Sequence, residues 1–370
     1  MRRLVVLAVL LALLVPNVSP AEEASEERET ELYLTPVEMT FDEEWTIISD
    51  WSEEREAELY HTPLEMTLDE EWTIILDWLA FSGLLEVEAF LEDTDGENSG
   101  DILISTIEFG LKGLLSEEVS LLMEVDFDFE FGEVTIDYDE EPWIARLGIQ
   151  YVAFGYYYSH FISAAMTEDL GVTKEKAFMV GFVPEGLDIS VWVANGDADK
   201  AGKEDRIDDY GLSFMVTPLE NFEFGVSFIS DMADTDDELV SSVYSRRVSG
   251  ASVFFVWEIG DLELVGEYIT ATRDFSPADL DEDGDGKGDT PSAFNAEIAW
   301  DLIEDMELAF RVGGSAEFVD EPESQYGACI SYGIWEGMSL SLEYLHEEFD
   351  SDFSDEQKRD AVTTNLGIEF

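Results

Sequence analysis

The sequence predicts an all-β protein, a transmembrane antiparallel up-and-down β-barrel of about 16 strands. Apolar and polar residues alternate with a period of two from Leu79 to Phe370, and the connections between the alternating stretches are short and long in turn. The last residue is an aromatic one in phase with the final stretch. A soluble β-sandwich shows the same alternation, so the other two observations decide in favour of a barrel.

The N-terminus has the pattern of a secretory signal peptide. Arg2 and Arg3 precede an apolar run from Leu4 to Val15, and small residues end at Ala21 before an acidic stretch. The run is too short for a membrane-spanning helix. We therefore expect residues 1–21 to be removed near Ala21 and the mature chain to be exported to the outer membrane of a Gram-negative bacterium.

A tandem duplication follows the predicted cleavage site. Residues 25–51 recur at 52–78 with five differences. Two copies are fewer than a solenoid needs to bury a continuous core. We interpret residues 22–78 as an acidic periplasmic extension; a tolerated insertion and a peptide-binding or cell-wall-binding segment both stay open.

Residues 79–370 hold the predicted strands. The clearest runs from Val119 to Phe131, where an apolar face alternates with an almost wholly acidic one. Further alternating stretches occur along the chain, and the last of them is Val362–Phe370. Short connections are predicted at 113–118, 184–186, 218–221, 260–261, 301–305 and 335–337, and polar loops at 93–100, 196–206, 231–250, 274–290 and 347–360.

Aromatic side chains support a membrane setting. Trp143, Tyr151, Trp257 and Trp300 are near predicted strand ends, as in the interface girdles of barrels in contact with lipid. Phe370 looks like the C-terminal aromatic signal that outer-membrane proteins present to the barrel assembly machinery. We therefore expect outer-membrane lipid and that machinery as partners, while no residue indicates an oligomeric state.

Composition excludes several classes. The 370 residues include 18 Lys and Arg against 87 Asp and Glu, a formal net charge of −69, which rules out nucleic acid as a partner. A single cysteine, Cys329, rules out a disulfide framework. The three histidines are scattered, and no G-x-S-x-G nucleophile motif occurs, so we expect no enzyme.

A barrel of this size encloses an aqueous channel unless something plugs it. The acidic face of the 119–131 stretch would favour cations in that channel, although acidic residues that only solvate the wall would look the same. Arg146 is predicted to face the lumen as an ion-pair partner of carboxylates, with contact to a passing anion as the alternative. The lumen and constriction candidates are Glu124, Asp126, Asp128, Arg146, Gln150, Phe154, Tyr157, Glu168, Lys174 and Arg311.

The segment 152–176 is the longest irregular one, and it is rich in aromatic residues. Loops of this length are usually functional or disordered, and its apolar content argues against disorder. We interpret it as a loop that folds into the channel as a constriction. A loop that folds over the barrel rim is the alternative.

Four runs resemble the LbtU-type siderophore porin family of Gram-negative outer-membrane barrels. They are GLLEVEAF (Gly83–Phe90), ARLGIQYVAFG (Ala145–Gly155), ISAAMTEDLGVTKEKAFMVGF (Ile162–Phe182) and WVANGD (Trp192–Asp197). The resemblance implies uptake of a ferric siderophore, and hence iron, without the plug of TonB-dependent receptors. A general cation-selective porin and a structural or adhesive barrel without transport are the alternatives.

The acidic loop before the stretch at 292 spaces carboxylates as a Ca²⁺ loop does. Asp281, Asp283, Asp285 and Asp289 fit D-x-D-x-D-G-x-x-D. The twelfth position is Ser292, so the bidentate Glu of an EF-hand is missing. Structural Ca²⁺ and a plain solvated turn both stay open, and no other cofactor is predicted.

Overall fold

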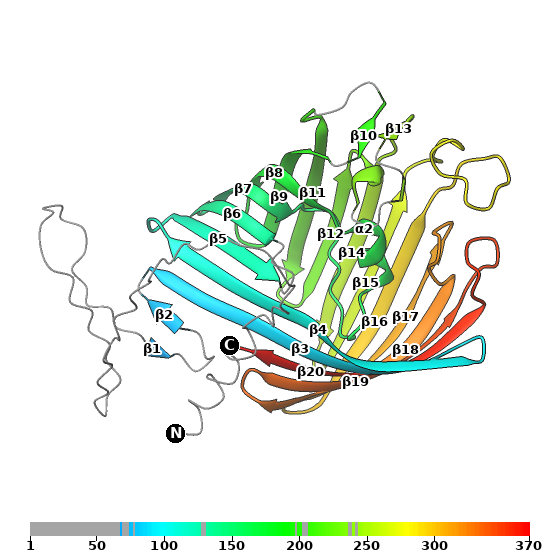
Figure 1. Cartoon of the computed structure of the whole chain (residues 1–370). Coiled ribbons are helices and arrows are strands. Elements are labelled where there is room, and N and C mark those ends of the chain that lie inside the picture. The colour runs from blue at the N-terminus through cyan, green and yellow to red at the C-terminus, as the bar shows by residue number, and fades with distance from the viewer. Residues whose placement is uncertain are drawn as a thin grey trace, which may run out of the picture. The chain divides into compact units, whose positions relative to one another are not determined.

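A computed structural model describes residues 67–68, 74–76, 78–126, 131–196, 198–201, 206–235, 239–240 and 243–370 (Figure 1). It contains one α-helix in these ranges, α2 (Met166–Gly171), and a 3-10 helix at Met232–Asp234. The strands are β1 (Thr67–Leu68), β2 (Ile74–Leu76), β3 (Leu79–Thr94), β4 (Glu97–Leu114), β5 (Val119–Asp126), β6 (Phe131–Glu140), β7 (Trp143–Tyr151), β8 (Lys174–Phe182), β9 (Leu187–Asn195), β10 (Asp199–Lys200), β11 (Asp209–Leu219), β12 (Phe222–Ile229), β13 (Val243–Tyr244), β14 (Gly250–Ile259), β15 (Leu262–Ala271), β16 (Ser292–Ile303), β17 (Met306–Ala316), β18 (Ser324–Trp335), β19 (Met338–Glu348) and β20 (Lys358–Glu369).

Sixteen of the described strands close into one antiparallel barrel, as the sequence predicts. Each pairs with its neighbours in chain order, except that β9 pairs with β11 and β12 with β14 across short strands that leave the ring. The ring closes where β20 pairs with β3, with Val362 opposite Leu91. Closure gives the barrel strands partners on both sides, which removes the exposed edges that an open sheet would have.

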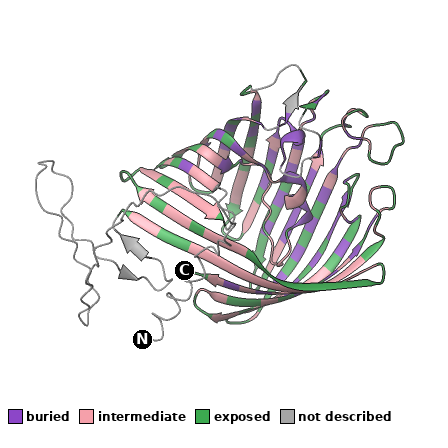
Figure 2. Cartoon of the chain, viewed as in Figure 1, coloured by how far each residue is buried: buried purple, intermediate pink, exposed green. Residues whose placement is uncertain are grey.

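The described strands alternate between two faces. On β14, Val253, Phe255 and Trp257 are exposed, while Phe254 and Val256 between them are buried. The same rows continue on β15–β17. In a closed barrel one face points outward, and only the outward face can present a continuous exposed apolar row to lipid. Burial is concentrated on β8–β19 and α2, whereas β3–β7 are mostly intermediate or exposed (Figure 2).

One of the predicted polar loops is wrong. Residues 93–100 belong mostly to strands, because β3 and β4 continue to a two-residue turn at Asp95-Gly96. Both turn residues have positive φ, 54° and 92°, as a type I′ hairpin turn requires. The Asp-Gly pair is the sequence signal for this turn. The other predicted turns and loops coincide with strand ends.

The predicted strand from Val119 to Phe131 is also wrong in its second half. β5 ends at Asp126, and Phe131 already belongs to β6, where it pairs back with Val125. Residues 127–130, and with them candidate Asp128, lie outside the described residues. Period-two alternation continues through this connection, which has neither Gly nor Pro to indicate a turn.

β2 and the last residue of the chain both pair with β3. The predicted signal peptide and the first repeat copy lie outside the described residues; in the second copy, β2 pairs with the first residues of β3. Phe370 exchanges two backbone hydrogen bonds with Gly83. Its ring occupies the space where a side chain at position 83 would be, which explains the glycine there. The role of Phe370 in assembly stays a prediction. Among the described residues, no helix has the length and apolarity needed to cross a membrane.

Candidate functional site

The connection between β7 and β8 lies inside the barrel (Figure 1). We call residues 152–173 the inner loop; its base is closed by a hydrogen bond from the Val152 N–H to the Thr173 carbonyl (3.0 Å). Its helix α2 contacts β15, β16 and β17. The wall residues that it contacts alternate with the exposed apolar row, so the loop lies on the inward face. We call the inward faces of β14–β19 the covered wall.

Glu267 on β15 holds the first part of the inner loop. Its Oε1 accepts the Tyr156 N–H (2.8 Å), and its Oε2 accepts the Tyr157 N–H (3.0 Å) and the Thr167 hydroxyl (2.9 Å). The Ser252 hydroxyl donates to Oε1 from the neighbouring strand (3.0 Å). A buried carboxylate that accepts four hydrogen bonds fixes the backbone direction at the start of the loop.

Glu297 and Arg311 hold the middle. Glu297 Oε2 accepts the His160 N–H (2.8 Å), and its Oε1 accepts from the Ser159 hydroxyl (2.9 Å). Arg311 Nε pairs with the same carboxylate at 2.9 Å, and both side chains of the pair are completely buried. The guanidinium also donates to the Ser163 and Ala164 carbonyls (2.9 and 2.8 Å). The buried pair therefore holds the loop backbone against the wall, because Glu297 accepts a backbone N–H group and Arg311 donates to backbone carbonyls.

Glu343 on β19 holds the last part before α2. One of its oxygens accepts both the Ile162 N–H (2.7 Å) and the Ser163 N–H (3.1 Å). Glu267, Glu297 and Glu343 are only 7%, 4% and 2% exposed. Three wall carboxylates thus accept hydrogen bonds from backbone N–H groups of the loop, which has no sheet partner of its own.

Alternate side chains of the inner loop form a ladder along the covered wall. Tyr156 stacks on Phe254 with ring centroids 4.3 Å apart, and its other side meets the edge of Tyr158. Tyr158 contacts the His160 ring at 5.0 Å. Tyr158 is 43% exposed, so an aromatic surface next to the lumen remains accessible.

His160 lies between two carboxylates of the covered wall. Its Nδ1 is 3.0 Å from Glu307 Oε1, and its Nε2 is 3.0 Å from Glu263 Oε1. Burial lowers the pKa of His160, but the hydrogen bond and charge of Glu307, together with the charges of Glu263 and Glu297, raise it above its ordinary value overall. The protonated imidazole therefore fits this position better than the neutral one.

The inward faces of β3–β7, which we call the open wall, carry carboxylates that the inner loop does not cover. In ring order β5 and β6 are half the ring away from β15 and β16. Arg146 lies among these carboxylates, with Nε 2.7 Å from Asp137 and Nη1 3.7 Å from Glu133. Further acidic residues of this wall that are at least partly exposed include Glu86, Glu88, Glu108, Glu124 and Asp126.

The structure places five of the sequence candidates away from the open lumen. Gln150 and Arg311 are buried. Phe154, a residue of the inner loop, is 1% exposed and belongs to the buried apolar cluster. Tyr157 adopts a positive φ of 57° and packs its ring against Gly155 and Gly171. Lys174 is on the same face of β8 as the exposed Phe178, 5.9 Å from the Tyr151 ring, and so points outward. Alternation predicts faces but not which faces a loop covers.

Four candidates stay beside the lumen: Glu124, Asp126, Arg146 and Glu168. Glu168 and Asp169 are on the less buried side of α2. Burial and the charge of Asp169 raise the pKa of Glu168, and burial raises the pKa of Asp169 to about 6. These two carboxyls add negative charge to the loop side of the channel only as the pH rises.

The predicted Ca²⁺ loop brings part of its carboxylates together. Oxygens of Asp281, Asp283 and Asp285 lie within 4.8 Å of one another. Asp289 is outside this group: it is buried, and it accepts the Glu282 N–H (2.8 Å). Lys287 pairs with Asp285. Ca²⁺ binding here stays a prediction.

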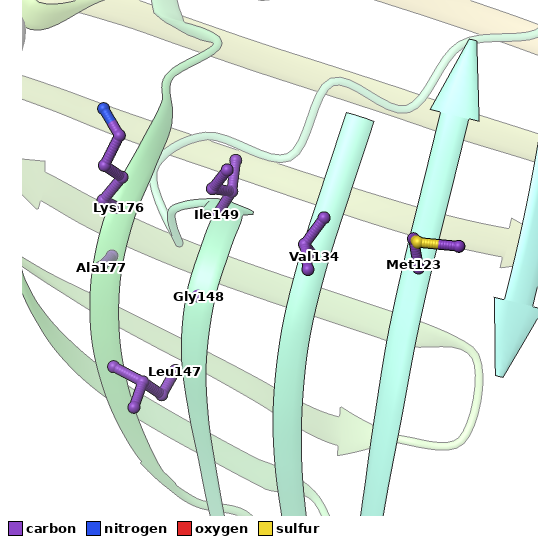
Figure 3. Close-up of a pocket in the computed structure, with 7 residues that line it drawn as sticks. All are labelled: Met123, Val134, Leu147, Gly148, Ile149, Lys176 and Ala177. Carbon is purple, nitrogen blue, oxygen red and sulfur yellow. The ribbon is translucent and has the colours of Figure 1, made fainter. Parts of the chain in front are cut away.

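An apolar hollow spans β5–β8 (Figure 3). Met123, Val134, Leu147 and Ile149 line it together with Lys176. These side chains belong to the outward rows of their strands, since Leu147 is 56% exposed and alternates with Arg146. The hollow is therefore a surface for lipid contact rather than a solute site.

The residues that hold the inner loop were missed at the sequence level. Glu267, Glu297 and Glu343 each occupy a polar position in an alternating strand, like any solvated carboxylate. Their only local sign is that neighbouring inward positions are apolar or small, such as Val265 and Ile269 around Glu267. That sign indicates a surface that something covers.

No family model matches the chain. It is 25% identical over 299 residues to a UPF0422 protein of Coxiella burnetii, which covers 73% of this chain and 64% of that protein. A UPF0422 protein of Legionella pneumophila (strain Lens) is 23% identical over 290 residues, with 67% and 54% covered. The chain thus spans between about half and two thirds of the length of these curated relatives.

Solved porin structures resemble the barrel. The outer-membrane channel DcaP of Acinetobacter baumannii and an anion-selective porin from Comamonas acidovorans both give a TM-score of 0.58 at 11% identity, over 79% of this chain and 97% or 99% of theirs. OmpF of Salmonella typhi, in complex with daunomycin, gives 0.56 at 11% identity over 79% and 97%. These likenesses show that the chain has the fold of outer-membrane porins.

Proposed function

We propose that the chain is an outer-membrane channel that admits a small solute through a cation-favouring lumen, and that a ferric siderophore is this solute. The observation that supports a channel is the open wall: its carboxylates face the lumen, and the inner loop is held against the other side of the barrel. Fixed charge along a water-filled passage with low-dielectric walls concentrates counter-ions.

The siderophore is supported by the LbtU-type resemblance, which is most specific over residues 146–182. That stretch contains the whole inner loop. The exposed ring of Tyr158 offers a planar surface on which an aryl group could stack. A general cation-selective diffusion porin is the second candidate, because the acidic open wall needs no specific ligand to select cations.

The similar solved porins do not determine the ion selectivity of this chain. One of the similar porins is described as anion-selective, whereas the open wall here presents several at least partly exposed carboxylates, such as Glu86, Glu88 and Glu124, and one arginine, Arg146. We therefore expect cation preference despite the shared fold, since wall charge and not strand number sets selectivity.

Planar-bilayer recordings of the refolded mature chain test the proposal. We expect a stable conductance with a reversal potential that indicates cation preference, and partial block when a ferric siderophore is added. Cation preference without block would favour the general porin. Absence of conductance would overturn both and leave a structural barrel.

A charge-neutralised variant locates the selectivity. The triple change Glu86→Gln, Glu88→Gln and Glu124→Gln should lower the cation-to-anion permeability ratio about twofold or more, because it removes charge from the open wall. The matched control neutralises three exposed residues of the short turns: Glu220→Gln, Glu304→Gln and Glu336→Gln. Equal effects of the two triples would place the selectivity outside the open wall.

A further inference from the structure

On the long-loop side of the barrel, the β9–β11 and β12–β14 connections pack against each other. Their short strands β10 and β13 pair in parallel, with Asp199 opposite Val243. Ala198 of the first connection shares a buried apolar cluster with Met232, Tyr244 and Val248 of the second. The two connections therefore form one folded unit at the barrel mouth.

Three buried aspartates lie at the base of this unit. Asp209 begins β11, Asp231 precedes the 3-10 helix of the next connection, and Asp234 is the last residue of that helix. The three are 4%, 0% and 7% exposed. One carboxylate oxygen from each lies within 4.8 Å of the others. Charges this close and this dry repel strongly unless positive charge accompanies them.

Arg247 supplies part of that positive charge. Its Nη2 is 2.9 Å from Asp209, and its Nε is 3.0 Å from Asp231. Tyr244 and the Ala233 N–H also donate to Asp231. Asp208 shares the same guanidinium, with Nη2 at 3.0 Å, so one positive charge serves several carboxylates. The nearby Glu175, 3% exposed, adds to the negative potential at Asp234.

Asp234 has the least compensation of the three. Its Oδ1 accepts the Ala198 N–H (3.0 Å), but its Oδ2 is buried and has no hydrogen-bond partner. Burial, together with the charges of Asp209 and Asp231, raises the pKa of Asp234 well above its ordinary value. Gly196 adjoins this carboxylate so closely that a Cβ there would lie 2.2 Å from it. No side chain at position 196 can fill the space beside Asp234.

We propose that Asp209, Asp231 and Asp234 bind one divalent cation of the oxygen-seeking class, Ca²⁺, which fastens the two connections together at the channel mouth. Ca²⁺ binds oxygens at about 2.3–2.6 Å, so two ligands on opposite sides of the ion are about 4.6–5.2 Å apart. The three carboxylate oxygens lie within 4.8 Å of one another, so none is too far from the others to share one ion. The ion would supply the missing positive charge and a partner for Asp234 Oδ2.

The group Asp281, Asp283 and Asp285 provides a matched comparison. Its oxygens satisfy the same 4.8 Å limit, but Asp283 and Asp285 are exposed, and Lys287 already pairs with Asp285. Solvated carboxylates tolerate their mutual repulsion because water screens it. The buried group should therefore bind Ca²⁺ more tightly than the exposed one.

Calorimetric titration of CaCl₂ into the chelator-treated mature chain, refolded in detergent without lipopolysaccharide, tests this site. We expect one dominant Ca²⁺ site that Asp234→Asn weakens at least tenfold and that the double change Asp281→Asn, Asp283→Asn leaves unchanged. Asparagine keeps the acceptor for Ala198 and removes a repulsive charge, so the variant should fold. Absence of Ca²⁺ binding, or loss only in the 281/283 variant, would overturn the proposal.

Limited proteolysis gives a second readout. Ca²⁺ should slow cleavage after Arg246 and Arg247 in the wild type by several-fold relative to chelator, and it should have no effect on Asp234→Asn. In chelator alone, Asp234→Asn should resist cleavage better than the wild type, because asparagine is neutral and has no charge to be neutralised when it is buried. Cleavage rates independent of Ca²⁺ in the wild type would contradict the fastening role.

Discussion

The covered wall and the open wall use the same kind of residue for different purposes. Both present inward carboxylates that alternate with outward apolar side chains. On the covered wall, Glu267, Glu297 and Glu343 are buried and accept backbone N–H groups of the inner loop. On the open wall, Glu124 and Asp126 are at least partly exposed, and no segment of the inner loop covers them.

The two walls thus contain two classes of carboxylate: those that hold the inner loop in place and those whose charge acts on a solute in the lumen. A carboxylate that accepts two or more N–H bonds has its charge compensated by donors, so it contributes little to the field in the lumen. A solvated carboxylate keeps its field. The overall acidity of the chain therefore overstates the charge that a solute meets, because the solvated carboxylates, such as those of the open wall, act on it most strongly.

The largest expected effect comes from breaking the covered wall at its only buried ion pair among the described residues. Arg311→Met would leave Glu297 buried without its cation and remove the bonds to Ser163 and Ala164. We expect a local cost of about 3–5 kcal/mol. The inner loop should detach, which would raise single-channel conductance and make the loop sensitive to protease.

Lys112→Met is the matched control for that experiment. It also removes one positive charge from an inward row, but Lys112 is exposed on β4, a strand of the open wall. Conductance and protease resistance should stay as in the wild type. A similar change in both variants would mean that the charge, and not the loop anchor, is responsible.

A smaller effect concerns pH and acts on the inner loop alone. Burial raises the pKa of Asp169 from 3.8 to about 6, so its contribution to loop stability is present below about pH 4 and is lost as the pH rises through 6. His160, with its raised pKa, contributes below its ordinary value of 6.5 and loses this contribution above its folded value. Asp169 and His160 both contribute more to loop stability at low pH, so the loop should be held more firmly at pH 5 than at pH 8.

Protease resistance of the inner loop at pH 5 and pH 8 measures this difference. We expect Asp169 to account for about 1–2 kcal/mol of it after solvent screening, so Asp169→Asn should flatten the profile. Asp139→Asn, at an exposed position of β6, is the control and should leave the profile unchanged. A loop that is firmer at pH 8 would contradict the assignment.

The sequence predicts the barrel well and the inner loop only in outline. Strand number and faces follow from period two, because lipid outside and water inside impose it on every strand. Arg146 was predicted as an ion-pair partner on the lumen face, and it pairs with Asp137. Arg311 has the same local pattern but is buried, since its environment is made by a loop more than a hundred residues earlier in the chain. Burial by a segment so distant in the chain leaves no periodic pattern in the sequence around Arg311.

The smallest effect is expected at Arg146, where the open wall has its own ion pair. The arginine side chain is 33% exposed, and such pairs contribute about 0–1 kcal/mol in water. Arg146→Gln should therefore hardly change the urea midpoint of unfolding, while it should raise the cation-to-anion permeability ratio slightly by removing positive charge from the lumen. Arg146→Lys keeps the charge and should keep the ratio. A loss of several kcal/mol in Arg146→Gln would show that the open wall is held as rigidly as the covered one, and the contrast between them would fail.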